Sequence, residues 1–507
     1  MRRLFSALLV TLLTACASTP KPAADSPALG EKAPPPDAAP DAEAFRAQPP
    51  EPGKAPDLVL PTFQSAKLEN GLTVLVSTRR ELPLVFAGVA FAAGSAQDPK
   101  GKEGLAELSY RMLLEGAGKR DTVALDNAFA DLGVSPGMDV QADGAQVGVR
   151  VLTRNLDTAM SLLSDVVLRP TFNAQAFDRR KKQQLADLVR ALGQPGVLAQ
   201  LAYLEAVFGL DHPYGHLSDG MPASVQTLTL ADVRGYYQKQ VGPAAAAIIL
   251  TGDISLDEGV ALARKYFGGW KGKATPPAPP KATQVSPRQQ VYVVPKPGLD
   301  QTLVLVGRAG IAAGNPDEYA LDLATTVFGG FFGSRLNMNL RENKGYSYGA
   351  GASLSPRLGV GPLTAYSSVR QDVTGPALTE VMNELSGLKT KPISAEELGA
   401  AREGLIRAFP GAFESVEGLG ASAAALYITR RPLDEFNRTV EGLRDASAED
   451  VQRKAEQYLD PASMQIVLVG DPATIQEQVT PLGLGKLVPV EPDEAPAVKP
   501  GAPRAVK

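Results

Sequence analysis

The sequence is poor in residues and patterns that several classes of function require. It has only two histidines and one tryptophan in 507 residues, which restricts metal chemistry. A net charge of −4 and a pI near 5.6 leave no basic surface to hold nucleic-acid phosphates, so we expect no nucleic-acid partner. No glycine-rich phosphate loop is present, which argues against a dinucleotide-binding fold. No apolar run reaches transmembrane length.

The single cysteine lies in a segment typical of exported bacterial proteins. Two arginines precede an apolar stretch over residues 4–13, which is too short to span a membrane, and a Leu-Thr-Ala-Cys sequence ends at Cys16. This end resembles a lipobox, so residues 1–16 are predicted to be a lipoprotein signal with Cys16 as the lipidated residue. A plain secretory signal is the alternative. An aspartate after the lipidated cysteine often retains lipoproteins at the inner membrane, and Ala17 stands there instead. We therefore expect the protein at the periplasmic face of the outer membrane.

Proline-rich stretches divide the remainder of the chain. Residues 17–58 are rich in alanine, proline and acidic residues, and they are predicted to be a disordered tether because they have too little apolar surface to bury. Residues 271–290 are predicted to link two domains, 59–270 and 291–490. A disordered tail is expected over 491–507.

The two predicted domains are related by an internal repeat. ADVRGYYQKQVGPAAAAIILTGD (231–253) matches EDVQRKAEQYLDPASMQIVLVGD (449–471) at a constant offset, which aligns Asp232 with Asp450 and Pro243 with Pro461. Each segment indicates a helix, a turn at a proline and an apolar strand that ends in Gly-Asp. Residues 82–94 and 301–314 are expected to be buried strands, and residues 174–192 a helix. The sequence therefore predicts a duplicated α+β unit of roughly 200 residues.

Three segments resemble the insulinase/pitrilysin family of zinc metallopeptidases, which includes the mitochondrial processing peptidase. GLAELSYRML (104–113) falls where that family has an inverted zinc-binding helix, and DHPYGH (211–216) resembles its His-Pro-Tyr-Gly stretch. GGFFGSRLNMNLRENKGYSY (329–348) resembles its second-half signature. The resemblance covers residues 60–485 and implies two homologous domains, each with a mostly antiparallel sheet packed against helices.

The zinc motif of that family is degenerate in this chain. The His-x-x-Glu-His pattern implies that Glu107 and Arg111 occupy the two ligand positions and Tyr110 the general-base position, while Asp187, farther along the chain, occupies that of an additional acidic ligand. Because a guanidinium keeps its proton and cannot bind a cation, we expect no intact catalytic residue and no metal in this chain. Our hypothesis is that Arg111, Glu107 and Asp187 form a charged cluster in place of zinc. The alternative is that the three side chains are solvated separately.

His212 and His216 have a spacing that could place two metal ligands on one helical face. Pro213 and Gly215 argue against an uninterrupted helix there. We therefore expect a turn in which His212 packs or hydrogen bonds locally, rather than a metal site.

The second domain contains a pair that the resemblance identifies as substrate-binding. In the family an arginine, and a tyrosine seven residues later, reach from the second domain toward the substrate, and Arg341 and Tyr348 have that spacing, with Gly345 to supply a turn. Such a pair can donate hydrogen bonds to a peptide carbonyl and stabilise an oxyanion. Arg341 could instead pair locally with Glu342.

The resemblance thus implies a pseudoprotease, a non-catalytic subunit that supplies Arg341 and Tyr348. Its expected partners are a homologous chain that carries the zinc motif, with zinc as that chain's cofactor, and a peptide or unfolded protein as substrate. Two alternatives stay open. One is a non-proteolytic structural or assembly protein on the same fold. The other is an active zinc metalloendopeptidase that uses oxygen ligands from Glu107 and Asp187.

Overall fold

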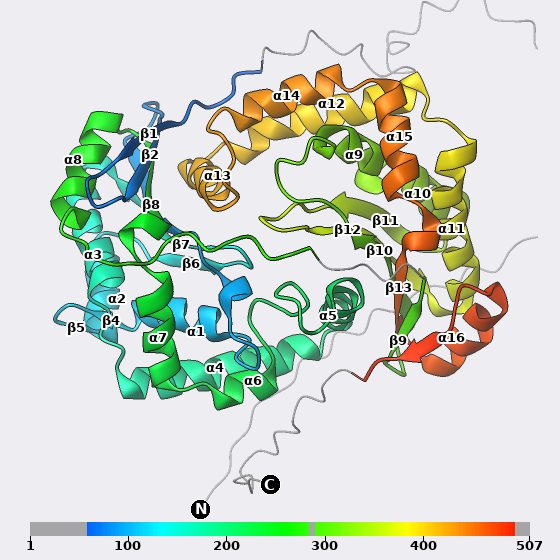
Figure 1. Ribbon diagram of the computed structural model, residues 1–507, viewed down its shortest axis with the longest axis horizontal. Helices are drawn as coiled ribbons and strands as arrows, with labels where there is room; N and C mark the ends of the chain where they lie inside the picture. The colour runs from blue at the N-terminus through cyan, green and yellow to red at the C-terminus, as the bar shows by residue number, and fades with distance from the viewer. Residues whose placement is uncertain (1–57, 283–288, 492–507) are drawn as a thin grey trace, which may run out of the picture. The chain divides into compact units, whose positions relative to one another are not determined.

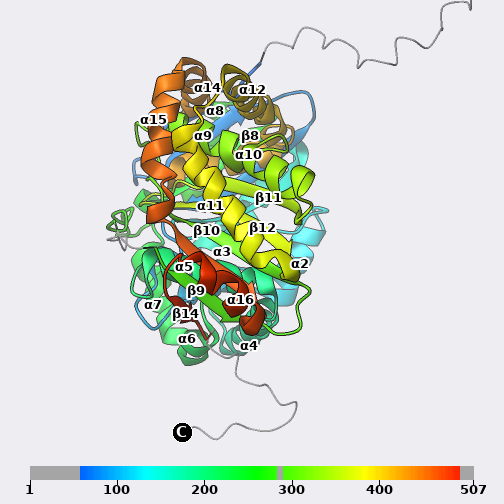
Figure 2. The same cartoon turned by 90° about the vertical axis from the view of Figure 1, so that its right-hand side faces the viewer.

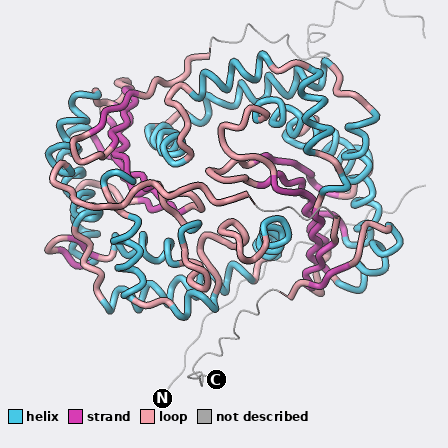
Figure 3. The backbone as a smooth tube through the Cα atoms, in the orientation of Figure 1, coloured by secondary structure: helices cyan, strands magenta, loops and turns pink. Residues whose placement is uncertain are grey.

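The computed structural model describes residues 58–282 and 289–491 (Figure 1). The predicted signal with Cys16, nearly all of the tether and the tail after residue 491 lie outside the described residues. Within the described ranges, strands gather into two separate six-stranded sheets with helices around them (Figure 3). No helix in these ranges is both long and apolar enough to cross a membrane.

The first half of the chain forms a six-stranded sheet, a two-stranded sheet of β4 and β5, and eight α-helices in the described residues. Its strands are β1 Gln64–Lys67, β2 Thr73–Thr78, β3 Leu84–Phe91, β4 Gly116–Ala117, β5 Arg120–Asp121, β6 Gly137–Val140, β7 Ala145–Leu152 and β8 Ala246–Gly252. Its helices are α1 Leu105–Arg111, α2 Thr122–Ala130, α3 Leu156–Leu168, α4 Ala174–Leu192, α5 Pro195–Phe208, α6 Pro222–Thr227, α7 Leu230–Gln240 and α8 Leu256–Phe267.

The second half repeats this order with local differences. Its strands are β9 Val291–Pro295, β10 Gln301–Ala309, β11 Ser347–Leu354, β12 Pro362–Arg370, β13 Gln465–Gly470 and β14 Leu487–Pro489. Its helices are α9 Glu318–Thr325, α10 Arg335–Asn337, α11 Thr374–Thr390, α12 Ala395–Ala412, α13 Val416–Ile428, α14 Glu435–Asp445, α15 Ala448–Tyr458 and α16 Pro472–Val479. Two π-helical turns, Thr326–Gly330 and Met338–Asn343, follow α9 and α10.

The strand order of the two sheets confirms the predicted duplication. The first sheet runs β1-β2-β8-β3-β7-β6 and the second β11-β12-β10-β13-β9-β14. The central order β2-β8-β3-β7 thus corresponds to β9-β13-β10-β12, and both pairs β2/β8 and β9/β13 are parallel within otherwise mostly antiparallel sheets. The fold is therefore the expected α+β fold with two homologous units.

Equivalent helices in the two units begin at equivalent caps. The Thr229 hydroxyl at the start of α7 accepts a hydrogen bond from the Asp232 amide, and at the matching position of the repeat the Ser447 hydroxyl accepts one from the Asp450 amide. A side-chain oxygen at this position satisfies an amide that the first helical turn leaves unpaired. The sequence match between the two units therefore has a structural basis in shared helix starts.

Each half contributes one helix to the sheet of the other half. Helix α13 packs against β3 and β8 of the first sheet, and α5 packs against β10 and β13 of the second (Figure 1). The approach of α13 is close, because a Cβ atom on Gly420 would lie 2.3 Å from the ring of Phe86. On the other face of the second sheet lies α11 (Figure 2). Residues 58–491 thus share apolar cores that cross the middle of the chain.

Candidate functional site

Helix α1 carries the degenerate motif and begins at a turn that Gly104 and Asp98 stabilise. Gly104 has a φ of 94°, which favours glycine, and the Asp98 carboxylate accepts hydrogen bonds from the amides of Gly104 and Ala106, both at 2.8 Å. The helix is short, because it changes to a 3₁₀ turn at Met112. These contacts fix which side chains of α1 face the interior.

Glu107 and Arg111 form the ion pair that their i, i+4 spacing predicts. Arg111 Nε lies 2.7 Å from Glu107 Oε1, and the side chains are 37% and 12% exposed. Burial raises the pKa of Glu107, and the neighbouring guanidinium of Arg111 opposes this shift. The positive charge of Arg111 thus stands at a motif position that the resemblance assigns to a metal ligand.

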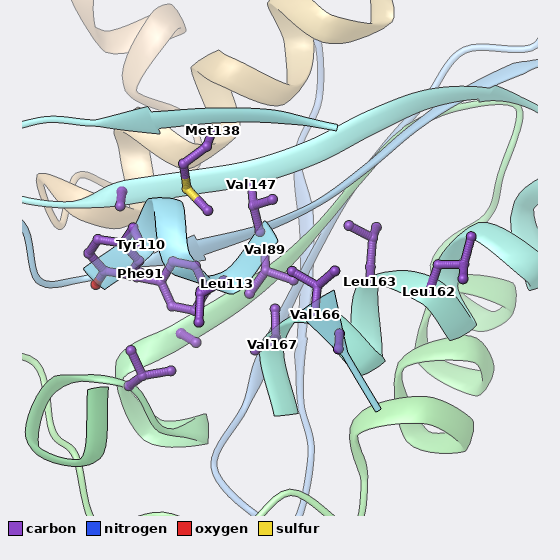
Figure 4. Close-up of a cluster of buried hydrophobic side chains, with 14 of the residues drawn as sticks. Val89, Phe91, Tyr110, Leu113, Met138, Val147, Leu162, Leu163, Val166 and Val167 are labelled. Atoms are coloured by element: carbon purple, nitrogen blue, oxygen red, sulfur yellow. The ribbon is translucent and has the colours of Figure 1, made fainter. Parts of the chain in front are cut away.

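Tyr110 points into the core of the first unit (Figure 4). Its side chain is 1% exposed, its hydroxyl donates a 2.7 Å hydrogen bond to the Ala93 carbonyl, and its ring packs 5.1 Å from Phe91 and 5.8 Å from Tyr236. Burial raises the pKa of the phenol well above its ordinary value. A neutral, fully packed phenol cannot take a proton from a water molecule, so the general-base position is structural here.

The Glu107–Arg111 pair borders a cavity of about 340 Å³. Asp187 on α4 also lines this cavity, but its carboxylate pairs with Arg190 at 2.7 Å rather than with Arg111. The predicted cluster therefore forms between Arg111 and Glu107 but does not include Asp187. Arg190 lies one helical turn from Asp187, so a local partner replaces the distant one.

The cavity is also lined by four polar residues that the sequence did not reveal: Arg180, Gln183, Gln184 and Asp219. The Gln184 amide donates hydrogen bonds to the carbonyls of Gly104 and Asp219, at 3.1 and 2.8 Å. This glutamine thus ties α4 to the start of α1 and to the loop that carries Asp219. Residues so far apart in the sequence have no common motif, and only the expected proximity of Asp187 to the motif indicated that α4 lies beside α1.

The residues at this site do not fit a zinc ion. A zinc site needs neutral nitrogen, thiolate or carboxylate ligands, whereas here a guanidinium pairs with the one carboxylate of the motif. Within the described residues, no group of three histidine, cysteine, aspartate or glutamate side chains is arranged to hold a metal ion. We therefore derive no reaction step through a metal in this chain.

Arg341 and Tyr348 lie close in sequence on the second unit, but no hydrogen bond or ion pair joins them within the described part of the chain. Arg341, in the π-helical turn Met338–Asn343, pairs with Glu342 at 3.1 Å and lies over the ring of Phe332, 4.9 Å from its centre. Gly345 supplies the expected turn with a φ of 62°. Tyr348 lies at the start of β11 with its side chain 90% exposed, so its phenol is open to a binding partner.

Comparisons with known proteins agree with these features. The family model described as Insulinase (Peptidase family M16) matches residues 73–202, and that described as Peptidase M16 inactive domain matches residues 227–405. The chain belongs to peptidase family M16. It is 23% identical over 343 residues to an uncharacterized zinc protease of Rickettsia bellii, which covers 67% of this chain and 81% of that protein.

Two solved structures share the fold of this M16 chain. A peptidase M16 inactive domain from Pseudomonas fluorescens has a TM-score of 0.75 at 27% identity and covers 81% of this chain and 98% of that one. A protease from Helicobacter pylori has a TM-score of 0.75 at 19% identity and covers 81% of this chain and all of that one. The second similarity supports the fold alone.

The His-Pro-Tyr-Gly stretch of this M16 chain is a structural turn. The His212 ring stacks on Phe208 at 5.2 Å, its Nδ1 accepts from the Tyr214 amide at 3.0 Å, and its Nε2 lies 2.9 Å from the Lys281 carbonyl. The other histidine, His216, hydrogen bonds to the adjacent Leu217 carbonyl at 3.1 Å. His212 thus makes the local contacts that the turn predicts, and it also makes a distant one to Lys281.

Tyr214 in the same stretch links the two halves, a role that the sequence did not indicate. Its hydroxyl donates to Asp143 and accepts from the Gly359 amide at 2.9 Å, and the same carboxylate accepts from the Leu358 amide at 2.8 Å. The guanidinium of Arg357 lies 4.7 Å from the centre of the Tyr214 ring. The motif therefore contributes to the junction between the units rather than to chemistry.

Proposed function

We propose that this chain is a non-catalytic subunit of an M16-family zinc peptidase. It binds peptide or unfolded protein together with a homologous chain that carries the intact zinc motif. The observation that carries the proposal is the contrast between the units. Arg111 pairs with Glu107 and Tyr110 is fully packed, so these motif positions offer neither a free metal ligand nor a general base, whereas Tyr348 is freely exposed.

Arg341 and Tyr348 are the residues proposed to contact substrate. A guanidinium and a phenol are both donors, and they can hydrogen bond to a peptide carbonyl in the partner's site and to the oxyanion formed when water attacks it. The pairing of Arg341 with Glu342 is half-exposed, so binding a carbonyl costs little. The Phe332 ring beneath the guanidinium holds it over the surface.

The proposal is tested by expressing this chain with a homologue that has an intact zinc motif. Co-purification and cleavage of an unfolded substrate only by the pair are expected. Arg341→Ala and Tyr348→Phe should each lower kcat/KM by about tenfold or more while the pair still assembles. Arg438→Ala removes an exposed arginine paired with Asp434 and serves as the control, with no effect expected.

Other outcomes separate the competing functions. Full activity of the pair with both substitutions would support an assembly role without contribution to proteolysis. Chelator-sensitive cleavage by the isolated chain would support an active peptidase and contradict the proposal. A pair that never forms, with any homologue supplied from the same genome, would also contradict it.

We also propose that the chain is exported and anchored through a lipid on Cys16. Residues 1–16 support this location, because they have a basic start, a short apolar stretch and a lipobox-like end. Metabolic labelling with palmitate should mark the wild-type chain and not Cys16→Ser, and the wild-type chain should fractionate with the outer membrane. Labelling that persists in the variant would contradict the anchor.

A further inference from the structure

The proline-rich segment KGKATPPAPPKA (271–282) has a regular pattern of exposure that a simple spacer does not require. No helix or strand forms between Phe267 and Val291 in the described residues. Ala274 is buried, Pro277 and Pro280 are half-buried, and the positions between them are exposed. A burial period of three residues is that of a polyproline II helix with one of its three faces against the protein.

The residue types impose this conformation. The ring of each proline fixes its own φ at a value that polyproline II shares, and each residue before a proline is restricted to extended or polyproline II geometry. Four positions, Thr275, Pro276, Ala278 and Pro279, each precede a proline. The segment is therefore ordered before any partner binds, which lowers the entropy cost of recognition.

Three contacts hold the inward face against the body of the protein. Arg430, at the end of α13, donates to the Pro277 carbonyl, and the His212 ring bonds to the Lys281 carbonyl at 2.9 Å. Between them the Pro280 carbonyl oxygen packs against Gly359, where an added Cβ would lie 3.0 Å from this oxygen and crowd it. The segment, which leads away from α8 in Figure 1, is thus fixed by both units.

The outward faces display two dipeptides in a spacing that proteins recognise. Thr275-Pro276 and Ala278-Pro279 are exposed, and exposed Lys281 follows two positions after the second proline. Aromatic-lined grooves bind such PxxP segments, with each x-Pro pair between aromatic rings. Lys271, Lys273 and Lys281 are exposed, so their positive charges favour a groove flanked by acids.

We propose that residues 275–281 are a polyproline recognition site for a partner protein with an aromatic-lined groove bordered by carboxylates. The partner contacts Pro276 and Pro279 through its aromatic rings and Lys281 through its acids. Pro277 and Pro280 face this chain and set the conformation without touching the partner. The site is independent of the proposed proteolytic role.

The test uses the full chain and a purified SH3 domain of the class that prefers a basic residue after PxxP as the probe. Calorimetry should detect binding to the wild-type chain. Pro276→Ala with Pro279→Ala, and separately Lys281→Glu, should each weaken it by about tenfold or more. Pro277→Ala is the matched control, and it should keep affinity within about threefold because this side chain faces inward.

Two results would overturn the proposal. One is the absence of binding to the wild-type chain at probe concentrations that saturate a free PxxP peptide. The other is an equal loss of affinity in Pro277→Ala and in Pro276→Ala with Pro279→Ala. This result would mean that the segment binds only after it leaves the protein surface. Unchanged circular dichroism and melting of the variants show that the chain stays folded.

Discussion

The strength of the ion pair between Arg111 and Glu107 can be worked out from its geometry and then measured. Two unit charges about 4 Å apart attract by about 4 kcal/mol at an effective dielectric constant of about 20. The 37% exposure of Arg111 and the desolvation of Glu107 reduce this value. We expect a net coupling of about 1–2 kcal/mol, above the about 0.3–0.5 kcal/mol of exposed i, i+4 pairs.

Arg111→Met keeps much of the side-chain length and removes the charge. Burial already raises the pKa of Glu107 while Arg111 opposes the shift, so the pKa should rise further in the variant. A carboxyl whose pKa is higher in the folded than in the unfolded state opposes folding once it ionises. Stability is therefore lost as the pH rises from the ordinary value of 4.5 through the folded value. The free energy of unfolding of the variant should equal that of the wild type near pH 4 and be lower by about 1–2 kcal/mol at pH 8.

Urea unfolding of four proteins measures this coupling: wild type, Glu107→Gln, Arg111→Met and the double variant. The double variant should recover most of the stability lost by Arg111→Met, because no buried charge is left unpaired. Arg190→Met removes the exposed pair with Asp187 at the same cavity and should cost no more than about 0.5 kcal/mol. A loss of stability in Arg111→Met that does not depend on pH would refute the reasoning. A loss no larger than that of the Arg190→Met control would also refute it.

Three further predictions follow from single contacts. Tyr110→Phe should lower the free energy of unfolding by about 1–2 kcal/mol in urea denaturation, because the Ala93 carbonyl loses its buried donor; an unchanged midpoint would contradict this. The Arg335 guanidinium lowers the pKa of Glu397 to about 2, so this pair stabilises the fold above about pH 4.5 and is lost as the pH falls toward 2. Glu397→Gln should therefore lower stability at pH 7 and flatten its decline on acidification, and a decline as steep as in the wild type would argue against the pair. Tyr203→Phe removes a buried 2.6 Å hydrogen bond from α5 to a β12 carbonyl and should cost about 1–2 kcal/mol, with faster hydrogen exchange in β12; exchange that changes only in the first sheet would contradict it.

The sequence was sufficient for features that depend on local chemistry and on the repeat. Helix α4 has the predicted bounds, residues 174–192, because its apolar face and its Asn173 cap are both local signals. The strands expected in 82–94 and 301–314 are β3 and β10. The constant offset of the repeat relates helices and strands in the same order in both units. The predicted domain boundaries remain predictions, because the apolar cores cross the middle of the chain.

Other features depend on contacts between distant segments and could not be predicted from the sequence. The apolar faces of α5 and α13 indicate burial, but nothing in their periodicity states that each covers the opposite sheet. Asp187 forms its ion pair with Arg190, one helical turn away, whereas the sequence suggested Arg111 as its partner. Local pairs compete successfully with distant ones because they require no ordering of separate elements.

The second unit provides an internal reference for what the degenerate motif contributes. Under the offset that aligns Asp232 with Asp450, Thr325 and Phe328 correspond to Glu107 and Tyr110, and both are buried in the second unit. Within the same chain, this helix position is thus filled without a charge, so the fold itself does not require the carboxylate of Glu107. At this helix position the charge of Glu107 is therefore a feature of the first unit. The Glu107–Arg111 pair keeps a polar, partly exposed surface where an uncharged buried side chain was structurally available, and it places a permanent cation at a motif position that the family uses for a metal ligand.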